Sequence, residues 1–292
     1  MRPGWWRSRR QGANVVSALA VAFVFFASAL GAALFGIFLR GRLPEHHVSE
    51  HSRGVIILST KLVATMTALL LGLLISSAND SLQGFSRGLE QMGARFATLD
   101  RLLGAYGPET RDMRHDLRKH MVLALVTVWP EEKGRVAGLV SPEDLAEAGA
   151  QGDSPAPVIG SPQVSRLTHS FHARMEGALL ALSPADAAQR WRQSEALRQL
   201  GMLAEEHWLL VEQVHSTVPP TLVFLLLVWL VILFTTFGLF APRNATVTTV
   251  FVLCALSASA AIFVILEMNS VTSGLMKVSG EPLVKALGVI GR

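Results

Sequence analysis

The sequence predicts an all-α integral membrane protein, in which four transmembrane helices carry a cytoplasmic helical bundle inserted between the second and the third. Hydrophobic residues make up 50% of the 292-residue chain and charged residues only 16%, against about 25% charged residues in an ordinary soluble domain. The mean hydropathy is +0.40, and the apolar residues collect in long runs toward the two ends of the chain. Between these runs, apolar residues recur at the three- and four-residue spacing of amphipathic helices.

Four apolar segments are long enough to cross a bilayer, namely 14–39, 54–78, 218–240 and 245–268. Each has about twenty mostly apolar residues, which at about 1.5 Å rise per residue cross a hydrocarbon core of roughly 30 Å. Any one of them alone is also compatible with a buried helix of a soluble protein, but four such runs with so few charges favour a membrane protein. The expected organisation is a basic N-terminal tail (1–13), two transmembrane helices (14–78), a cytoplasmic helical domain (79–217), two further transmembrane helices (218–268) and a C-terminal cytoplasmic tail (269–292).

The first apolar run follows the basic stretch RPGWWRSRRQG and therefore has to be distinguished from a secretory signal. The apolar region of a signal peptide is only about 7–15 residues long, and the run 14–39 is clearly longer. Its small residues, Ala27 to Ala29, lie in its middle rather than at a cleavage position. We expect a retained first transmembrane helix.

The positive charges near the helix ends predict the orientation. Arginines precede the first helix, and an even number of spans puts both termini and the central region on the same side. Arg40, Arg42 and Arg53 in the following loop oppose this bias in part. We expect a multi-pass protein of the bacterial inner membrane with both termini in the cytoplasm, given the N-terminal residues Arg2, Arg7, Arg9 and Arg10 and the C-terminal residues Lys277, Lys285 and Arg292.

The central region reads as a series of helices. One apolar stripe runs from Leu82 to Leu103, and a second runs from Met113 to Val128 before Pro130. The segment 136–162 is rich in Gly, Pro, Ala and Ser, which is typical of a connector. Ser183 before Pro184 is a suitable N-cap for a long helix that continues toward Pro219 and Pro220.

The second apolar segment carries a polar stripe on one narrow arc of its helix. At about 100° per residue, this arc holds Lys61, Thr65, Gly72, Ser76 and Asn79, together with Ala68. Three interpretations are open. In the first, the stripe is a helix–helix contact, because small and hydroxyl residues mediate such contacts. In the second, it is a pore wall in which Lys61 attracts an anion. In the third, Lys61 alone extends to the lipid headgroups.

The stretch SSANDS marks the exit of this helix from the bilayer. In one interpretation it is a hinge, with Asp80 capping a new helix that begins at Ser81. In the other, Asn79 and Asp80 lie at the inner mouth of a pore, close to Glu267 at the end of the fourth apolar segment.

The sequence contains few candidates for catalysis or metal binding. It lacks the GxxxxGK[ST] and HExxH motifs, and the single Cys254 excludes an internal disulfide and any multi-Cys metal site. Histidine pairs occur in HHVSEH (His46, His47, His51) and HSFH (His169, His172); such pairs can bind zinc but are more often ordinary polar residues. We expect no enzyme, no cofactor and no metal, and the net charge of +4 with interleaved signs favours a membrane surface over nucleic acid.

Two stretches, LLGLLISSANDSLQGF and FVILEMNSVTSGLMKVSGEPLVKAL, resemble the signature ends of the bacterial bestrophin-like membrane proteins, a family of largely unassigned function. Glu267, Ser273, Gly274, Lys277 and Ser279 fit the family pattern, whereas Asn269 replaces the usual Asp and Val271 the usual Pro.

The resemblance implies a homo-oligomeric channel or transporter for small anions, with five subunits by analogy with bestrophins. The acidic calcium-binding cluster of true bestrophins has no counterpart here, so calcium gating is not expected. The alternative function is a non-conducting membrane scaffold or sensor that binds a partner through its cytoplasmic helical domain.

Overall fold

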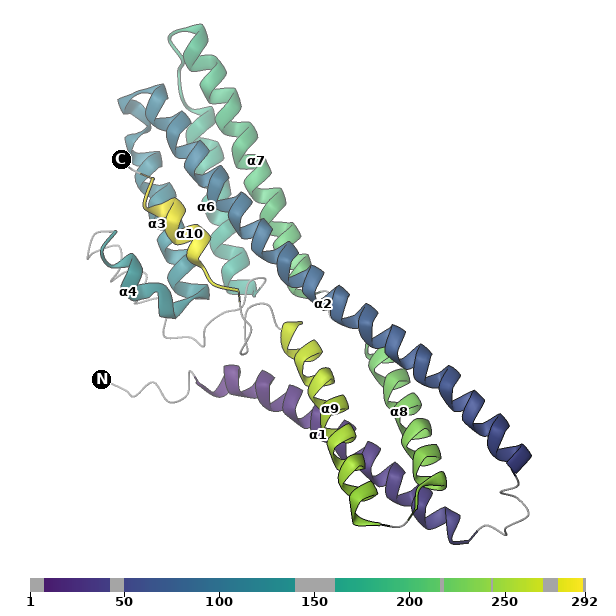
Figure 1. Ribbon diagram of the computed structural model, residues 1–292. Helices are drawn as coiled ribbons and strands as arrows, with labels where there is room; N and C mark the ends of the chain where they lie inside the picture. Colours follow the sequence, from purple (N-terminus) through teal and green to yellow (C-terminus); the bar gives the residue numbers. More distant parts are fainter. Residues whose placement is uncertain are drawn as a thin grey trace. The chain divides into compact units, whose positions relative to one another are not determined.

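The computed structural model describes residues 8–42, 50–139, 161–215, 218–242, 244–269 and 278–290. Within these ranges every regular element is a helix and no strand occurs, which confirms the predicted all-α class (Figure 1). The chain divides into two compact units. The apolar unit contains the described residues of 11–81 and 217–276, and the bundle unit contains those of 82–216 and 277–292 together with residues 8–10.

The apolar unit is formed by α1 (Ser8–Arg40), the first half of α2 (Glu50–Tyr106), α8 (Pro220–Phe240) and α9 (Ala245–Met268). These four helices are long and apolar enough to cross a membrane. Their starting points have local causes. Pro220 occupies the first turn of α8, where its missing N–H is not needed, and the Asn244 side chain caps α9 by accepting a hydrogen bond from the Val247 N–H at 2.9 Å.

Helices α1 and α8 approach each other so closely that their backbones touch. A Cβ atom added at Gly36 would collide with the Thr235 carbonyl oxygen, and one added at Gly238 would collide with the Ala33 carbonyl oxygen. Only glycine permits this approach, which is a common device between membrane helices because small residues maximise van der Waals contact. The side chains of Ala29 and Ala33 are buried at the same face of α1.

Helix α2 is one continuous α-helix of 57 residues, about 85 Å long at about 1.5 Å per residue. It passes through Ser76, Asn79, Asp80 and Ser81 without interruption, so the predicted hinge with Asp80 as an N-cap is wrong. The physical reason is that polar side chains signal water but do not break a helix by themselves. No Pro occurs in this stretch, and Asp80 is exposed on the helix surface.

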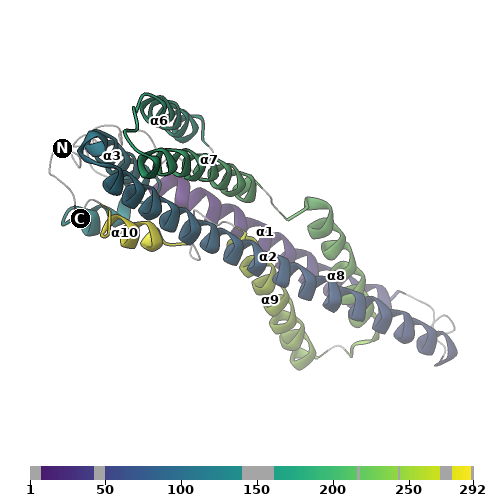
Figure 2. The same cartoon turned by 90° about the horizontal axis from the view of Figure 1, so that it is seen from above.

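The bundle unit contains the second half of α2 and a set of shorter helices. These are η3 (Pro108–Thr110), α3 (Arg111–Val128), η4 (Pro130–Glu132), α4 (Lys133–Val136), α6 (Pro162–Leu180), α7 (Ala187–His215) and α10 (Glu281–Leu287). Figures 1 and 2 show α6 and α7 side by side. The core is formed by the predicted apolar stripes and by residues of α6 and α7, including Phe85, Leu89, Leu99, Leu103, Leu117, Leu125, Phe171, Leu179 and Leu203, all at most 2% exposed.

Two local features of the bundle differ from the sequence prediction. Helix α7 begins at Ala187 rather than after Ser183, because Asp186 is the residue that accepts a hydrogen bond from the Gln189 N–H, at 2.6 Å. The Gln189 side chain accepts one in return from the Ala185 N–H at 2.7 Å, which is a variant of the reciprocal capping box. Helix α6 was not predicted, although its buried residues recur at helical spacing: Val164, Thr168, Phe171, Met175 and Leu179.

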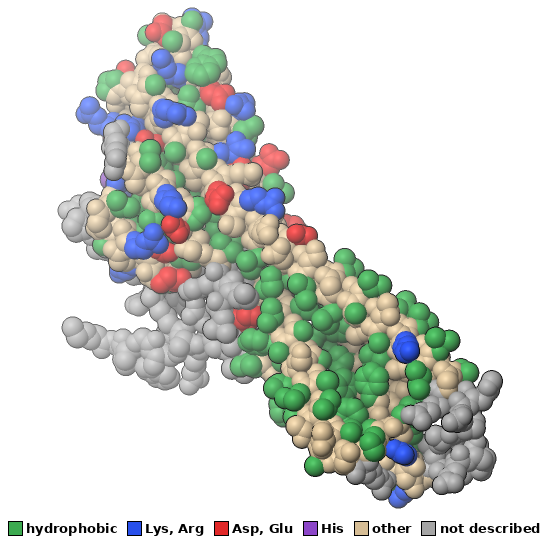
Figure 3. All heavy atoms as spheres, in the orientation of Figure 1, with side chains coloured by type: hydrophobic (Ala, Val, Ile, Leu, Met, Phe, Trp, Pro, Cys, Tyr) green, Lys and Arg blue, Asp and Glu red, His purple; other side chains and the backbone are tan. Residues whose placement is uncertain are grey.

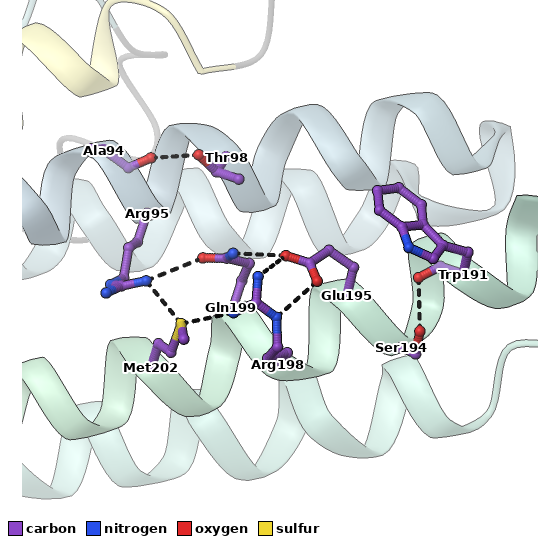
Figure 4. A network of polar contacts seen from close by, with 9 residues as sticks. All are labelled: Ala94, Arg95, Thr98, Trp191, Ser194, Glu195, Arg198, Gln199 and Met202. Carbon is purple, nitrogen blue, oxygen red and sulfur yellow. Dashed lines mark hydrogen bonds and ion pairs between the residues drawn. The ribbon is translucent and has the colours of Figure 1, made fainter.

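Polar contacts connect α2 to α7 within the bundle (Figure 4). Arg95 donates to the buried Glu206 carboxylate and also contacts Gln199 Oε1 at 3.5 Å and Met202 Sδ at 2.9 Å. A second buried carboxylate, Asp100, receives both guanidinium branches of Arg114 at 2.8 and 2.9 Å. Both buried carboxylates are thus paired with a guanidinium group, and removing one partner would leave the other charge buried without compensation.

Candidate functional site: a polar stripe on α2 and a histidine-lined cavity

The predicted polar stripe lies on the surface of the apolar unit. Lys61, Thr65, Gly72 and Ser76 are exposed and Asn79 is half-buried. The Thr65 hydroxyl donates to the Lys61 carbonyl oxygen at 2.9 Å, the back-bonding that allows a hydroxyl in an apolar helix. A Cβ atom at Gly72 would meet nothing within 4 Å, so this glycine makes no close helix contact within the chain.

Apart from Lys61, which borders a groove of its own chain described below, the stripe lies away from the side of α2 that packs against its own chain. In this part of α2 the buried positions are Thr60, Leu74 and Ala78. At about 100° per residue, these positions lie roughly 100° or more around the helix from the centre of the stripe. The helix-contact interpretation therefore finds no partner for the stripe within the described part of one chain.

The rest of this half of α2 is also unusually exposed. In its most apolar 18-residue window only 6% of the residues are buried, against 28% in each of α1, α8 and α9. Large apolar side chains such as Leu58, Leu62, Leu69 and Leu73 are more than 60% exposed. Hydrophobic side chains dominate the visible surface of this unit, whereas acidic and basic side chains gather on the bundle unit (Figure 3).

Lys61 also lines a groove of about 370 Å³ between α2, α8 and α9. It is the only charged side chain among the described residues that line the groove, whose walls include Phe237, Phe240 and Phe251. No Asp or Glu occurs in the sequence from Gly54 to Asn79. An ammonium group costs about 2.5–3.5 kcal/mol at the centre of a membrane helix. Lys61 lies seven residues after Gly54, where the apolar segment begins, so water, an anion or the lipid headgroups can all solvate it.

The two carboxylates assigned to an inner mouth have different environments. Asp80 is exposed, whereas Glu267 at the end of α9 is only 2% exposed. The inner mouth remains a hypothesis.

The family-like motif falls partly outside the described residues, which exclude Ser273, Gly274 and Lys277. Ser279 lies in the bundle unit, where its hydroxyl donates to Glu132 Oε1 at 2.9 Å and accepts from the Glu281 N–H at 3.1 Å. The indole N–H of Trp129 donates to the Val278 carbonyl oxygen at 2.8 Å. This end of the motif thus anchors α10 on the bundle.

The bundle also contains a cavity that the sequence did not predict. The cavity measures about 60 Å³, and among its otherwise mostly apolar lining are His120 of α3, His172 of α6 and His207 of α7. The only sequence signal is positional: His120 follows Leu117 by three residues and His207 follows Leu203 by four, so both occupy core positions of their helices.

The hydrogen bonds and pKa values of this cluster indicate neutral imidazoles. Burial, followed by the charges of neighbouring groups, lowers the pKa of His120 to about 3. Burial likewise lowers the pKa of His207 to about 4 and lowers that of His172, against a weaker opposing effect of its backbone hydrogen bond. His172 Nδ1 lies 2.8 Å from the Thr168 carbonyl oxygen, and its Nε2 atom is buried without a partner.

The two groups of neighbouring histidines noted in the sequence are only partly described by the structure. His46 and His47 lie outside the described residues, as does the side chain of His51, while His169 is exposed on α6. Within the described ranges, no three His, Cys, Asp or Glu side chains are grouped to hold a metal ion.

Comparison with known proteins gives one match. A family model described as Bestrophin-like domain matches residues 25–283. No curated protein and no solved structure matches the chain.

Proposed function

Because the chain belongs to the bestrophin-like family, we propose that it is a channel-type membrane protein whose copies assemble around a path for small anions. In this proposal the four apolar helices cross the bacterial inner membrane. The bundle, inserted between the second and third spans, lies in the cytoplasm together with both termini. The arginine-rich start of the chain supports this orientation.

The observation that carries the proposal is the polar stripe of α2. Its residues Thr65, Gly72 and Ser76 are exposed, and Lys61 borders a groove between α2, α8 and α9. A lipid-facing position would leave Lys61, Thr65 and Ser76 among hydrocarbon chains, where polar groups are costly. One narrow stripe cannot enclose water, whereas several copies arranged in a ring bring their stripes together around an axis. The exposed apolar side chains of α2 then contact neighbouring copies or lipid, and the family resemblance suggests five copies.

Selectivity for anions follows from the charges along the stripe. Lys61 is its only ionisable residue before Asp80, and the same helix has no carboxylate from Gly54 to Asn79. A ring of lysines repeats the positive charge around the path, and rings of like charge are a common basis of ion selectivity.

Planar-bilayer recording of the purified full chain under a chloride gradient tests the proposal. We expect a conductance that prefers chloride over potassium in the parent and in Lys61→Arg, and a preference for potassium or a loss of chloride preference in Lys61→Glu. Leu62→Gln, a polar change at the adjacent exposed position off the stripe, is the matched control and should leave selectivity unchanged. No conductance in several lipid compositions, or a chloride preference retained in Lys61→Glu, would overturn the proposal.

The second candidate is a non-conducting sensor or scaffold. It is favoured by the bundle unit, which has its own well-packed core and does not depend on a conducting path. A folded, strictly monomeric protein without conductance would favour this candidate.

A further inference from the structure

The cavity of the bundle brings together three imidazoles from three different helices. His120 stacks on Phe171 with a centroid distance of 4.0 Å and an interplanar angle of 6°. The ring centroid of Phe96 of α2 lies 6.4 Å from that of His120. His172 and His207 line the same space, together with Leu283 of α10 and Trp129. His120 is buried and His172 and His207 are half-buried. This is unusual for a cluster of imidazoles, because imidazole is half charged at about pH 6.5 in water.

The surroundings of the cluster favour the uncharged state. The titratable groups that act on His120 are His172 and Arg174 of α6 and His207 of α7. Each of them, when charged, opposes a positive charge on His120. His169 acts on both His172 and His207 in the same sense. Glu176 is the one acidic group that favours protonated His172, while α2 and α10 contribute apolar side chains to the lining.

We propose that this cluster makes the bundle a proton sensor. Its closed state, in which the cavity is small and mostly apolar, holds at neutral pH and gives way to a more hydrated open state when His120, His172 and His207 take up protons. A charged imidazole needs water or a carboxylate, and the closed cavity gives it mostly apolar walls and other histidines. Protons therefore bind to the open state in preference. The closed state is complete above about pH 6.5 and is lost as the pH falls toward the lowered values of the packed histidines.

The response is steep because three groups act together. Each histidine that stays neutral only in the closed state shifts the closed-to-open ratio by up to about tenfold per pH unit below about 6.5. Because His172 and His207 are half-buried, the three together change the ratio by more than about tenfold but less than about a thousandfold per pH unit. A fall in pH below about 6.5 then changes the state of the bundle without an additional ligand.

Opening also affects the anchoring of α10. Leu283 and Trp129 both line the cavity, and Trp129 holds Val278 through its indole N–H. Arg118 adds a hydrogen bond to the Ile290 carbonyl oxygen. Water in the cavity removes the apolar contacts that α10 makes with the bundle. Protonation of the histidines therefore shifts the equilibrium between attached and detached α10, the helix that follows α9 in the chain.

The proposal can be tested by thiol labelling of the full chain in lipid nanodiscs. In a Cys254→Ser background, Ala124→Cys places a thiol in the cavity wall, and Ala173→Cys places one on the exposed surface of α6. Maleimide reacts with the thiolate, so the labelling rate of each introduced cysteine depends on pH in the same way. The ratio of the labelling rate at position 124 to that at position 173 removes this common dependence. We expect this ratio to rise at least tenfold between pH 7.5 and pH 5, with a slope that corresponds to more than one proton.

Substitutions separate this mechanism from general acid loosening. His120→Phe, His172→Gln and His207→Gln should each lower the slope by up to one proton, while His115→Gln, at an exposed position of α3, should leave it unchanged. A constant ratio from pH 7.5 to 4.5 in the parent would overturn the proposal. So would a rise of undiminished slope in all three single variants, each checked for folding by circular dichroism. The readout does not require conduction, so it decides independently of the proposed channel function.

Discussion

The two halves of α2 bury their side chains to very different extents, although they belong to one uninterrupted helix. In the bundle half, Phe85, Leu99 and Leu103 are at most 1% exposed, whereas Leu58 and Leu69 in the apolar half are at least 70% exposed. The bundle half segregates apolar and polar residues, so one face finds partners in the same chain. The apolar half is hydrophobic nearly all round, and a helix of this kind requires lipid or another protein as its surroundings. Both halves are therefore helical, but the bundle half is surrounded by its own chain and water, whereas the apolar half requires lipid or another protein around it.

The largest expected difference in stability between the two halves of α2 is obtained by truncating one leucine in each half. Leu99→Ala should lower the free energy of unfolding by about 2–5 kcal/mol, because it leaves a cavity in a packed core. Leu69→Ala, with its side chain 70% exposed, should cost less than about 1 kcal/mol. Urea unfolding of the full chain in mild detergent measures both values. Equal losses would mean that the apolar half is packed as tightly as the bundle half.

A second test contrasts the exposed half of α2 with the closely packed pair α1 and α8. Gly238→Ala should destabilise the apolar unit by about 1–3 kcal/mol, since the added methyl group collides with the backbone of α1. Gly72→Ala meets nothing within 4 Å and should be neutral or stabilise the helix by up to about 1 kcal/mol. Thermal unfolding in detergent distinguishes them. Two similar losses would argue against the contact between α1 and α8.

The smallest effect is expected at the junction of the two halves. Asp80→Ala should change stability by no more than about 0.5 kcal/mol, because Asp80 lies within α2 and caps nothing. Asp186→Ala, which removes the actual cap of α7, should cost about 0.5–2 kcal/mol. A loss of the latter size at Asp80, in the same unfolding assay, would indicate a helix start at Ser81 after all.

The sequence reveals features that depend on neighbouring residues along one helix. The stripes through Phe85, Leu99 and Leu117 follow from spacing, and the apolar segments follow from length and composition. The hinge at Asp80 was predicted wrongly because polarity reports the surroundings of a helix and not its continuity. The cavity could not be predicted, since His120, His172 and His207 lie on three helices and their spacing in the sequence says nothing about how these helices pack.

The anchoring of α10 has a consequence for the biosynthesis of the protein. Trp129 and Val278, joined by a hydrogen bond, are 149 residues apart, which corresponds to roughly 7–30 seconds of translation at about 5–20 residues per second. During this interval α2, α3, α6 and α7 can associate, but the wall of the cavity contributed by Leu283 does not yet exist. The nascent bundle therefore exposes an apolar opening until the segment 278–290 leaves the ribosome. Chains that stop short of this segment should be recognised by chaperones or degraded more rapidly than the full chain.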